Sequence, residues 1–254
     1  MKHLVYKILI LSMATAICLA GCIPAQSPNS AETPPSTDIE PNDTTSANIE
    51  EDWQETFDVS ACTMSTTGQN QYFILEPGFQ LVLEGGNEVL IITVLDEIVN
   101  VDGIDTRVVE EREWKNSELI EVSRNFFAIC EETGDVFYFG EDVDMYQSGT
   151  FTSHSGAWRS GEEKAKFGLI MPGSPIIGMK YFQEVAPGVA MDRAEVISLD
   201  ETLETPAGTF PNSLKTQEGT ALNPLEVEYK TYAPGIGLIQ DQKLLLSNYG
   251  YIEQ

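Results

Sequence analysis

Basic side chains are scarce in this chain, which has 14 lysines and arginines against 40 aspartates and glutamates, for a formal net charge of −26. A surface this acidic repels the phosphate backbone of nucleic acids and the anionic headgroups of membranes. The sequence therefore predicts no nucleic-acid partner. A solvated acidic surface is the simplest interpretation, and cation binding or a salty habitat is the alternative.

Histidine is almost absent, with His3 near the start and His154 as the only two. A zinc site built from several imidazoles needs more than the single one left after export, so it is excluded. A Ser-His-Asp triad would have to use His154, whose nearest hydroxyls belong to Ser153 and Ser155. Adjacent residues of a strand point to opposite faces, and no Gly-x-Ser-x-Gly elbow is present. We interpret His154 as a surface loop residue.

Motifs for phosphate, dinucleotide or thiol redox chemistry are also missing. A phosphate loop, a Gly-x-Gly-x-x-Gly fingerprint and a Cys-x-x-Cys pair would each be recognisable from their spacing. The sequence therefore predicts no cofactor and no enzymatic activity.

No apolar run reaches the roughly 20 residues that a membrane-spanning helix needs. Residues 8–20 (ILILSMATAICLA) follow a basic start with Lys2 and Lys7, which is the layout of an export signal. The run ends in LAGC (19–22), a pattern typical of a bacterial lipobox. We predict that residues 1–21 are removed and that Cys22 receives lipid. An ordinary signal peptide with a chance cysteine is the alternative.

Lipidation would fix the location of the protein. Each buried CH₂ of an acyl chain contributes about 0.8 kcal/mol, so several chains make attachment effectively permanent. We therefore expect a lipoprotein anchored in the bacterial cell envelope. Ile23 is not the Asp that many Gram-negative sorting systems use for inner-membrane retention. The outer membrane is favoured in a Gram-negative cell.

Residues 22–58 begin with the lipidated cysteine and are rich in Pro, Ser, Thr, Asn and acidic residues. Such a composition buries too little apolar surface to offset chain entropy, so we predict a disordered tether. Residues 59–254 have the size of a single domain with a substantial core.

Cysteine is rare, and only Cys62 and Cys130 fall within this domain. In an exported protein, two remaining cysteines predict a disulfide. Two free thiols are the alternative, because sequence alone does not show that the side chains meet.

Helical periodicity is scarce in the domain, and short β-branched and aromatic runs bounded by Gly, Pro, Asn and Asp dominate instead. The expected strands cover residues 72–75, 79–83, 88–95, 106–111, 119–129, 136–139, 194–197, 226–232 and 236–240. We predict an all-β fold, an antiparallel meander of about ten strands in a half-barrel, barrel or sandwich. Residues 147–178, rich in Gly and Pro, are expected to form a long irregular connection.

The second half of the domain loosely repeats the first. VLDE (94–97) matches SLDE (198–201), and residues 121–128 match residues 226–233. The matches favour two similar halves. Chance similarity between short words in a β-rich chain is the alternative.

Two sets of acidic residues are candidates for chemistry. Asp96, Glu97, Asp200 and Glu201 hold matched places in the two halves, and a carboxylate-dependent hydrolase of envelope or extracellular polymers would need such pairs. Capping or turning a strand end is their simpler role. Loss of a measured activity when one of them is replaced would support the hydrolase.

The second set is Glu141, Asp142 and Asp144, which follow an aromatic strand. Clustered oxygen ligands near a turn suit calcium, and a calcium-stabilised structural surface protein would use them. The EF-hand spacing fails, because its sixth position falls on Gln147 where glycine is required. A calorimetric titration without calcium-dependent stabilisation would remove this hypothesis.

Aromatic residues are plentiful on the expected strands. They are Tyr72, Phe73, Phe126, Phe127, Phe137, Tyr138, Phe139, Tyr181, Phe182, Tyr229 and Tyr232. Where two adjoin, one ring faces inward and the other outward. In a curled, unclosed sheet the inward rings would line an apolar groove for an acyl chain, and ordinary core packing is the alternative.

Several longer words also carry a resemblance. They are YFILEPGFQLVLEGG (72–86), FYFGEDV (137–143), GLIMPG (168–173), APGVAMDRAEVISLDETLETPAGTF (186–210) and YAPGIGLIQD (232–241). Together they resemble a family of uncharacterised bacterial exported proteins and lipoproteins, over nearly the whole domain. The resemblance implies export and a single domain. The family has no assigned activity, so it implies no functional residues.

The preferred hypothesis is a membrane-anchored, non-enzymatic envelope lipoprotein whose β domain binds an apolar ligand or a partner protein. The tether, the strand pattern and the missing catalytic motifs motivate it. The sequence leaves the ligand-binding residues unknown.

Cys22→Ala should abolish lipid attachment, because the thiol of Cys22 is the acyl acceptor. In bacteria fed an alkyne analogue of palmitate, the wild-type chain should carry the label and the variant none. Cys62→Ala, which keeps the acceptor, is the matched control. An unlabelled wild-type chain would show an ordinary signal peptide.

Overall fold

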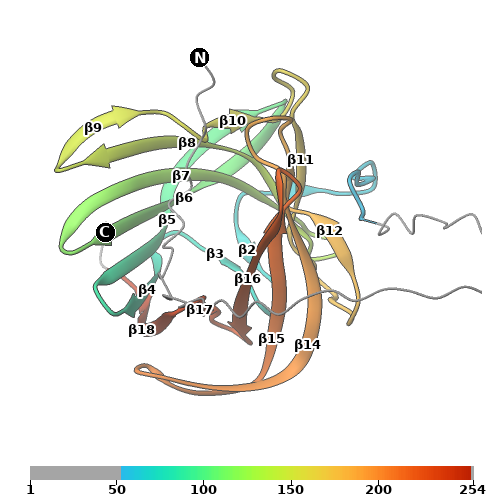
Figure 1. Cartoon of the computed structure of the whole chain (residues 1–254). Helices are drawn as coiled ribbons and strands as arrows, with labels where there is room; N and C mark the ends of the chain where they lie inside the picture. The colour runs from blue at the N-terminus through green and yellow to red at the C-terminus, as the bar shows by residue number, and fades with distance from the viewer. Residues whose placement is uncertain (1–52, 253–254) are drawn as a thin grey trace, which may run out of the picture. The chain divides into compact units, whose positions relative to one another are not determined.

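The computed structural model describes residues 53–252, which contain 18 strands and no helix (Figure 1). The strands of the first half are β1 (Met64–Ser65), β2 (Gly68–Gln69), β3 (Ile74–Leu75), β4 (Phe79–Gly85), β5 (Glu88–Val101), β6 (Ile104–Lys115), β7 (Glu118–Cys130) and β8 (Val136–Gln147). Those of the second half are β9 (Thr150–Ser153), β10 (Trp158–Arg159), β11 (Lys166–Met171), β12 (Lys180–Phe182), β13 (Glu184–Val185), β14 (Asp192–Thr205), β15 (Gly208–Thr220), β16 (Asn223–Ala233), β17 (Gly237–Asp241) and β18 (Leu244–Tyr251). The predicted all-β fold is confirmed.

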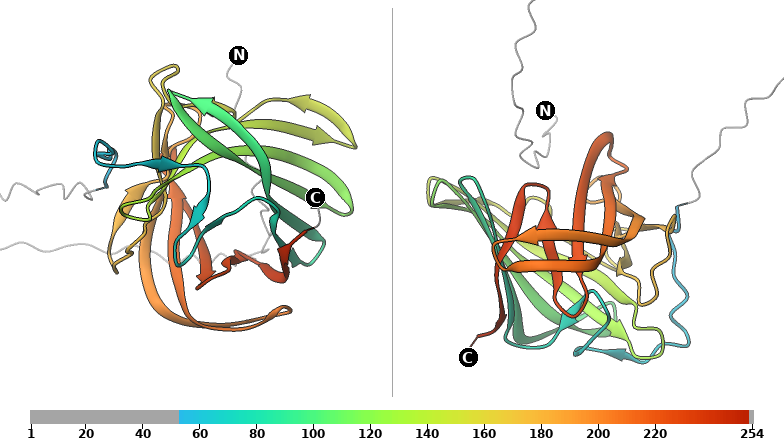
Figure 2. Two further views of the ribbon diagram at one scale, coloured as in Figure 1. Left: turned by 180° about the vertical axis from the view of Figure 1, so that it is seen from behind. Right: turned by 90° about the horizontal axis from the view of Figure 1, so that it is seen from below.

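One antiparallel sheet curls until it is nearly closed into a barrel. Its strand order is β12-β14-β15-β16-β17-β18-β4-β5-β6-β7-β8-β11-β13. The two ends of this order are consecutive in the chain, because only Gln183 separates β12 from β13. β12 pairs with β14 and β13 pairs with β11, so one short segment joins both edges. Figures 1 and 2 show the resulting ring of strands from the front and from behind.

The two halves share a three-strand meander. β5, β6 and β7 have 14, 12 and 13 residues, and β14, β15 and β16 have 14, 13 and 11. The matched words fall on β5 and β14, at places where the pairing register shifts between Val94 and Ile98 and between Ser198 and Glu201. Such shifts are bulges, which bend a strand and let a sheet curl.

The expectation of an irregular connection over residues 147–178 was wrong, because β9, β10 and β11 lie within it. All three pair with β8, which supplies the backbone partners that short, Gly-rich segments need to become strands. At Gly140 of β8 a Cβ atom would lie 2.4 Å from the carbonyl oxygen of Trp158. Glycine is therefore required for β10 to approach there.

The segment before β4 covers one end of the barrel. The Asn70 side chain donates to the Gly134 carbonyl at 2.8 Å, and the Gly235 amide donates to the Gln71 carbonyl at 2.8 Å. These contacts reach the β7–β8 and β16–β17 turns, so this is the plugged end. The β4–β5, β6–β7, β15–β16 and β17–β18 turns lie at the opposite end, which we call the mouth.

The packed part of the chain extends upstream of the boundary expected after residue 58. Gln54 forms a bridge with Tyr181, and the Phe57 ring lies 5.8 Å from that of Phe137. Residues 22–52 of the predicted tether, and Cys22 itself, lie outside the described residues.

The predicted disulfide between Cys62 and Cys130 is confirmed, with Cα atoms 5.1 Å apart and a sequence separation of 68. It fastens the N-terminal segment to the last residue of β7. Beside it, the Thr63 hydroxyl and amide both donate to the Glu132 carboxylate at 2.7 Å. The segment before β4, which covers the plugged end, is thus held by a covalent bond and by hydrogen bonds.

Replacing both cysteines by alanine should lower the free energy of unfolding by about 2–5 kcal/mol, because the cross-link restricts a long loop of the unfolded chain. Urea unfolding under oxidising conditions measures the loss. Wild-type protein kept in reductant should match the double variant. Equal stability of the oxidised wild type and the double variant would contradict the prediction.

Candidate functional site

Charged side chains gather inside the barrel near its mouth. They come from five strands of the sheet, and we call them the mouth cluster: Glu111 and Glu113 on β6, Glu121 on β7, Glu218 on β15, Lys230 on β16 and Asp241 on β17. The cluster holds five carboxyl groups and one ammonium group. Alternation along β16 explains its inward position, because Val227 and Tyr229 are exposed while Tyr232 is buried.

Lys230 and Glu218 form the centre of the cluster. The Lys230 ammonium lies 3.3 Å from Glu218 Oε2 and 3.9 Å from Asp241 Oδ2. The other oxygen of Glu218 accepts hydrogen bonds from the Thr216 hydroxyl at 2.7 Å and the Tyr232 hydroxyl at 3.2 Å. Glu218 is only 7% exposed, so these protein groups take the place of water around its carboxylate.

Burial works to lower the pKa of Lys230, but the charges of Glu218 and Asp241 outweigh it and hold that pKa well above its usual value. The pKa of Tyr232 is raised as well, and here burial acts in the same direction as the nearby negative charge. Burial and the nearby Glu218 charge raise the pKa of Tyr232 well above its usual range, so it stays a hydrogen-bond donor. Lys230 therefore remains a cation throughout the neutral range.

Glu113 behaves differently from Glu218. It stands opposite Glu121 on the neighbouring strand, two residues from Glu111. Burial, followed by the charges of Glu121, Glu111 and Asp241, raises the pKa of Glu113 from its usual 4.5 to about 8, against the opposing effect of Lys230. At neutral pH most molecules thus carry a proton on Glu113. A strongly shifted carboxyl group with identified neighbours marks a candidate functional site.

A second set of polar side chains lies on β7 and β8. The Tyr138 hydroxyl donates to Asn125 Oδ1 at 2.6 Å, and the Asn125 amide donates to Ser123 Oγ at 3.2 Å. The Trp158 ring packs edge-on to Tyr138 at 5.2 Å, and among the described residues its buried indole N–H has no hydrogen-bond partner. Burial and the charges of Glu141, Glu184 and Glu111 raise the pKa of Tyr138 well above its usual range.

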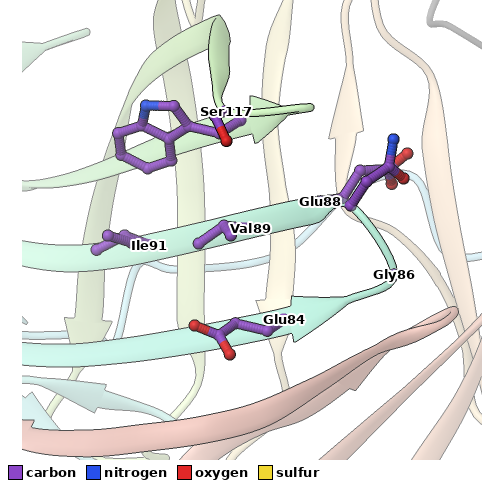
Figure 3. A pocket seen from close by; sticks show the side chains of 8 residues that line it. Glu84, Gly86, Glu88, Val89, Ile91 and Ser117 are labelled. Carbon is purple, nitrogen blue, oxygen red and sulfur yellow. The ribbon is translucent and has the colours of Figure 1, made fainter.

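An open groove of about 530 Å³ lies at the same end of the barrel, over β4, β5 and β6 (Figure 3). Val89, Ile91 and Trp114 contribute apolar surface, and Glu84, Asn87 and Ser117 contribute polar groups. We call it the outer groove.

The calcium candidates do not converge on one point. Both oxygens of Asp142 accept from Arg159 Nη2 at 2.8 Å, and Asp144 Oδ1 lies 2.9 Å from His154 Nδ1. Glu141 is opposite Trp158, on the other face of β8 from Asp142. Calcium would have to displace both basic partners. In residues 53–252 the only close group of metal-ligating atoms is Cys62, Cys130 and Glu132, two of which form the disulfide.

The hydrolase candidates are also separated. Asp96 pairs with Arg107 at 2.9 Å, and Glu97 lies 3.8 Å from Arg124. Asp200 accepts from the Ser198 hydroxyl at 3.0 Å, and Glu201 is on the same strand, β14. Five strands separate β5 from β14 in the sheet order, and both acids of the first pair are engaged by arginines.

The strand aromatics pack mainly against one another. Phe137 and Phe139 lie 5.7 and 5.0 Å from the Phe167 ring, and Phe73 lies 5.4 Å from Phe127. Tyr138 and Tyr181 are buried near carboxylates. Of the two alternatives given by the sequence, core packing describes these contacts.

Sequence reasoning missed the mouth cluster. Residues 106–111 and 226–232 are among the expected strands, but a polar face on a strand ordinarily marks its solvent side. The sequence therefore did not place Glu113 and Lys230 in an interior, because only closure of the sheet turns that face inward.

No protein-family model, no curated protein and no solved structure matches this chain. The resemblance to an uncharacterised exported family stays a prediction. Among residues 53–252 there is no helix that is long and apolar enough to span a membrane.

Glu113→Gln should remove a pH dependence of stability. Because the pKa of Glu113 is about 8 when folded and near 4.5 when unfolded, the folded state binds more protons between these values. The wild-type free energy of unfolding should therefore fall as pH rises from about 4.5 to 8. Glutamine mimics the protonated acid, so the variant should be more stable than wild type by about 2–4 kcal/mol at pH 9 and similar to it near pH 4.5.

Urea unfolding across this pH range measures the difference. Glu204→Gln, which removes an exposed carboxylate from β14, is the matched control and should keep the wild-type profile. Parallel profiles for wild type and Glu113→Gln would show that Glu113 titrates normally.

Proposed function

We propose that this chain is a non-enzymatic binding module, anchored to the envelope membrane through Cys22, which takes a positively charged ligand into the mouth of its barrel. The ligand class follows from the charges of the mouth cluster. Five carboxyl groups surround one ammonium group, and the sign of this balance selects cations.

The observation that carries the proposal is the gathering of acids around Lys230, whose ammonium lies 3.3 Å from Glu218 and 3.9 Å from Asp241. Burial and the charges of the neighbouring acids raise the pKa of Glu113 to about 8, so this acid keeps its proton at neutral pH. A cation that enters would place a positive charge beside Glu113, as Lys230 does beside Glu218. It would lower the pKa of Glu113 and release the proton, so that binding and deprotonation reinforce each other.

Binding, in preference to catalysis, is supported by how the polar groups are used. Glu218 is engaged by Lys230, Thr216 and Tyr232. These contacts hold the Glu218 carboxylate in place. An immobilised carboxylate suits electrostatic recognition better than proton transfer. The only described imidazole, His154, lies beside Asp144 and is mostly exposed, with 69% of its side chain accessible.

The sequence led us to expect an apolar ligand or a partner protein, and the proposal differs from both. An apolar ligand would need an apolar interior surface, whereas the inward face near the mouth carries the charged cluster. A partner protein would satisfy the site only through a lysine or arginine side chain. A small organic cation is the form of the ligand that we propose.

Spermidine titrated into the full chain in detergent should bind with release of protons at pH 7 and more tightly at pH 8 than at pH 6. Isothermal calorimetry in two buffers of different ionisation enthalpy counts the protons. Low salt is required because screening weakens the attraction. Glu113→Gln should bind without releasing protons, and Glu121→Gln should bind more weakly.

Glu204→Gln is again the control, because spermidine also associates with exposed acids all over this surface. Its affinity and proton release should equal those of the wild type. Equal proton release from wild type and Glu113→Gln, or equal weakening by Glu121→Gln and Glu204→Gln, would refute a site in the mouth.

A further inference from the structure

The outer groove is separate from the mouth cluster and is not used by the proposed function. Glu84, Val89 and Ile91, labelled in Figure 3, alternate along their strands with the buried Leu83 and Leu90 and therefore lie on the outer face of the sheet. Trp114 is opposite Val89 on β6 and lies on the same face. Glu113, next to Trp114 in sequence, faces the interior. The groove volume of about 530 Å³ is within the range of small-molecule sites.

Two hairpin turns give the groove a fixed shape. The Asn116 amide donates to the Asn87 carbonyl at 2.8 Å, and the Asn87 side chain donates to the Asn116 side chain. The β4–β5 and β6–β7 turns are thus tied side by side. Asn116 and Ser117 have φ of 52° and 64°, the left-handed pair of a tight hairpin turn. A ligand would meet a groove that is already formed.

The turn residue Gly86 leaves one end of the groove unobstructed. Its φ is +62°, and a Cβ atom placed there would find no atom within 4 Å. A ligand longer than the groove could therefore continue past this end.

Charge at the groove disfavours an anionic ligand. Glu88 lies 3.2 Å from the Lys115 ammonium and 3.0 Å from that of Lys243, so two cations already offset its charge. Glu84 at the rim is exposed and would repel an anion. A neutral ligand fits this balance.

The other side chains that line the groove indicate which kind of neutral ligand would bind there. Trp114 offers a flat, partly exposed ring beside Val89 and Ile91, which suits a ligand with one apolar face. Glu84, Asn87 and Ser117 supply a carboxylate, an amide and a hydroxyl that exchange hydrogen bonds with several hydroxyl groups. A pyranose ring has both properties, because its axial C–H bonds form an apolar face and its hydroxyls point outward.

We infer that the outer groove is a binding site for a neutral saccharide, in which one pyranose ring stacks on Trp114 and its hydroxyls bond to Glu84 and its polar neighbours. This site would let a tethered envelope protein hold a polysaccharide while its mouth remains available.

The chain contains three tryptophans, so incorporation of 5-fluorotryptophan gives three ¹⁹F resonances. Trp114→Phe identifies the resonance of Trp114. Titration of the full chain with cellohexaose and with chitohexaose should move this resonance and leave those of Trp53 and Trp158 in place. Mannitol, an acyclic polyol without an apolar ring face, should move none of them.

Substitutions then test the contacts. Trp114→Ala should weaken oligosaccharide binding about tenfold or more, and Trp114→Phe, which keeps a ring, by about threefold or less. Glu84→Ala, at an exposed position, should weaken binding without a change in stability. Tyr229→Ala removes an exposed aromatic ring from the outer face of β16 and should bind as wild type.

The inference is overturned if neither oligosaccharide moves the Trp114 resonance, or if mannitol moves it equally. It is also overturned if Trp114→Ala and Glu84→Ala, both folded, bind like the wild type. These outcomes are independent of the mouth cluster, whose test uses proton release.

Discussion

Closure of the sheet by the segment Lys180–Val185 is the constraint on which the rest of the structure depends. β12 and β13 give this segment two partners, β14 on one side and β11 on the other, so one short segment joins both edges of the long sheet. Because the ring closes, one face of every strand turns inward. Polar residues on that face become an enclosed, interacting set, and polar residues on the other face form a surface such as the outer groove.

Enclosure explains the electrostatics of the mouth. A buried ion pair contributes little to net stability, but it is costly to leave one of its members alone, so Lys230 and Glu218 require each other. Burial, followed by the charges of Glu121, Glu111 and Asp241, favours a proton on Glu113. An acid that keeps its proton at neutral pH is consistent with the cation site that we propose.

Part of this structure could be predicted from the sequence. Val-, Ile- and aromatic-rich runs specified β5, β7 and β8 because propensity and pairing agree there, and two leftover cysteines specified the disulfide. Closure could not be predicted, since it depends on pairing between Lys180–Phe182 and a strand that begins ten residues later and on Glu184–Val185 meeting β11. The inward face of β6 also depends on register shifts near Val94 and Glu113, which interrupt simple alternation.

The two walls of the mouth differ in what stands beside their acids. On β15 and β16 the Lys230 ammonium lies 3.3 Å from Glu218, and the Thr216 and Tyr232 hydroxyls donate to the same carboxylate. On β6 and β7 Glu113 stands opposite another acid, Glu121. Lys230 also acts on Glu113, but burial and the charges of the neighbouring acids outweigh it and raise the pKa of Glu113 to about 8. A cationic ligand beside Glu113 would lower that pKa, so the position that we propose for the ligand follows from this difference between the two walls.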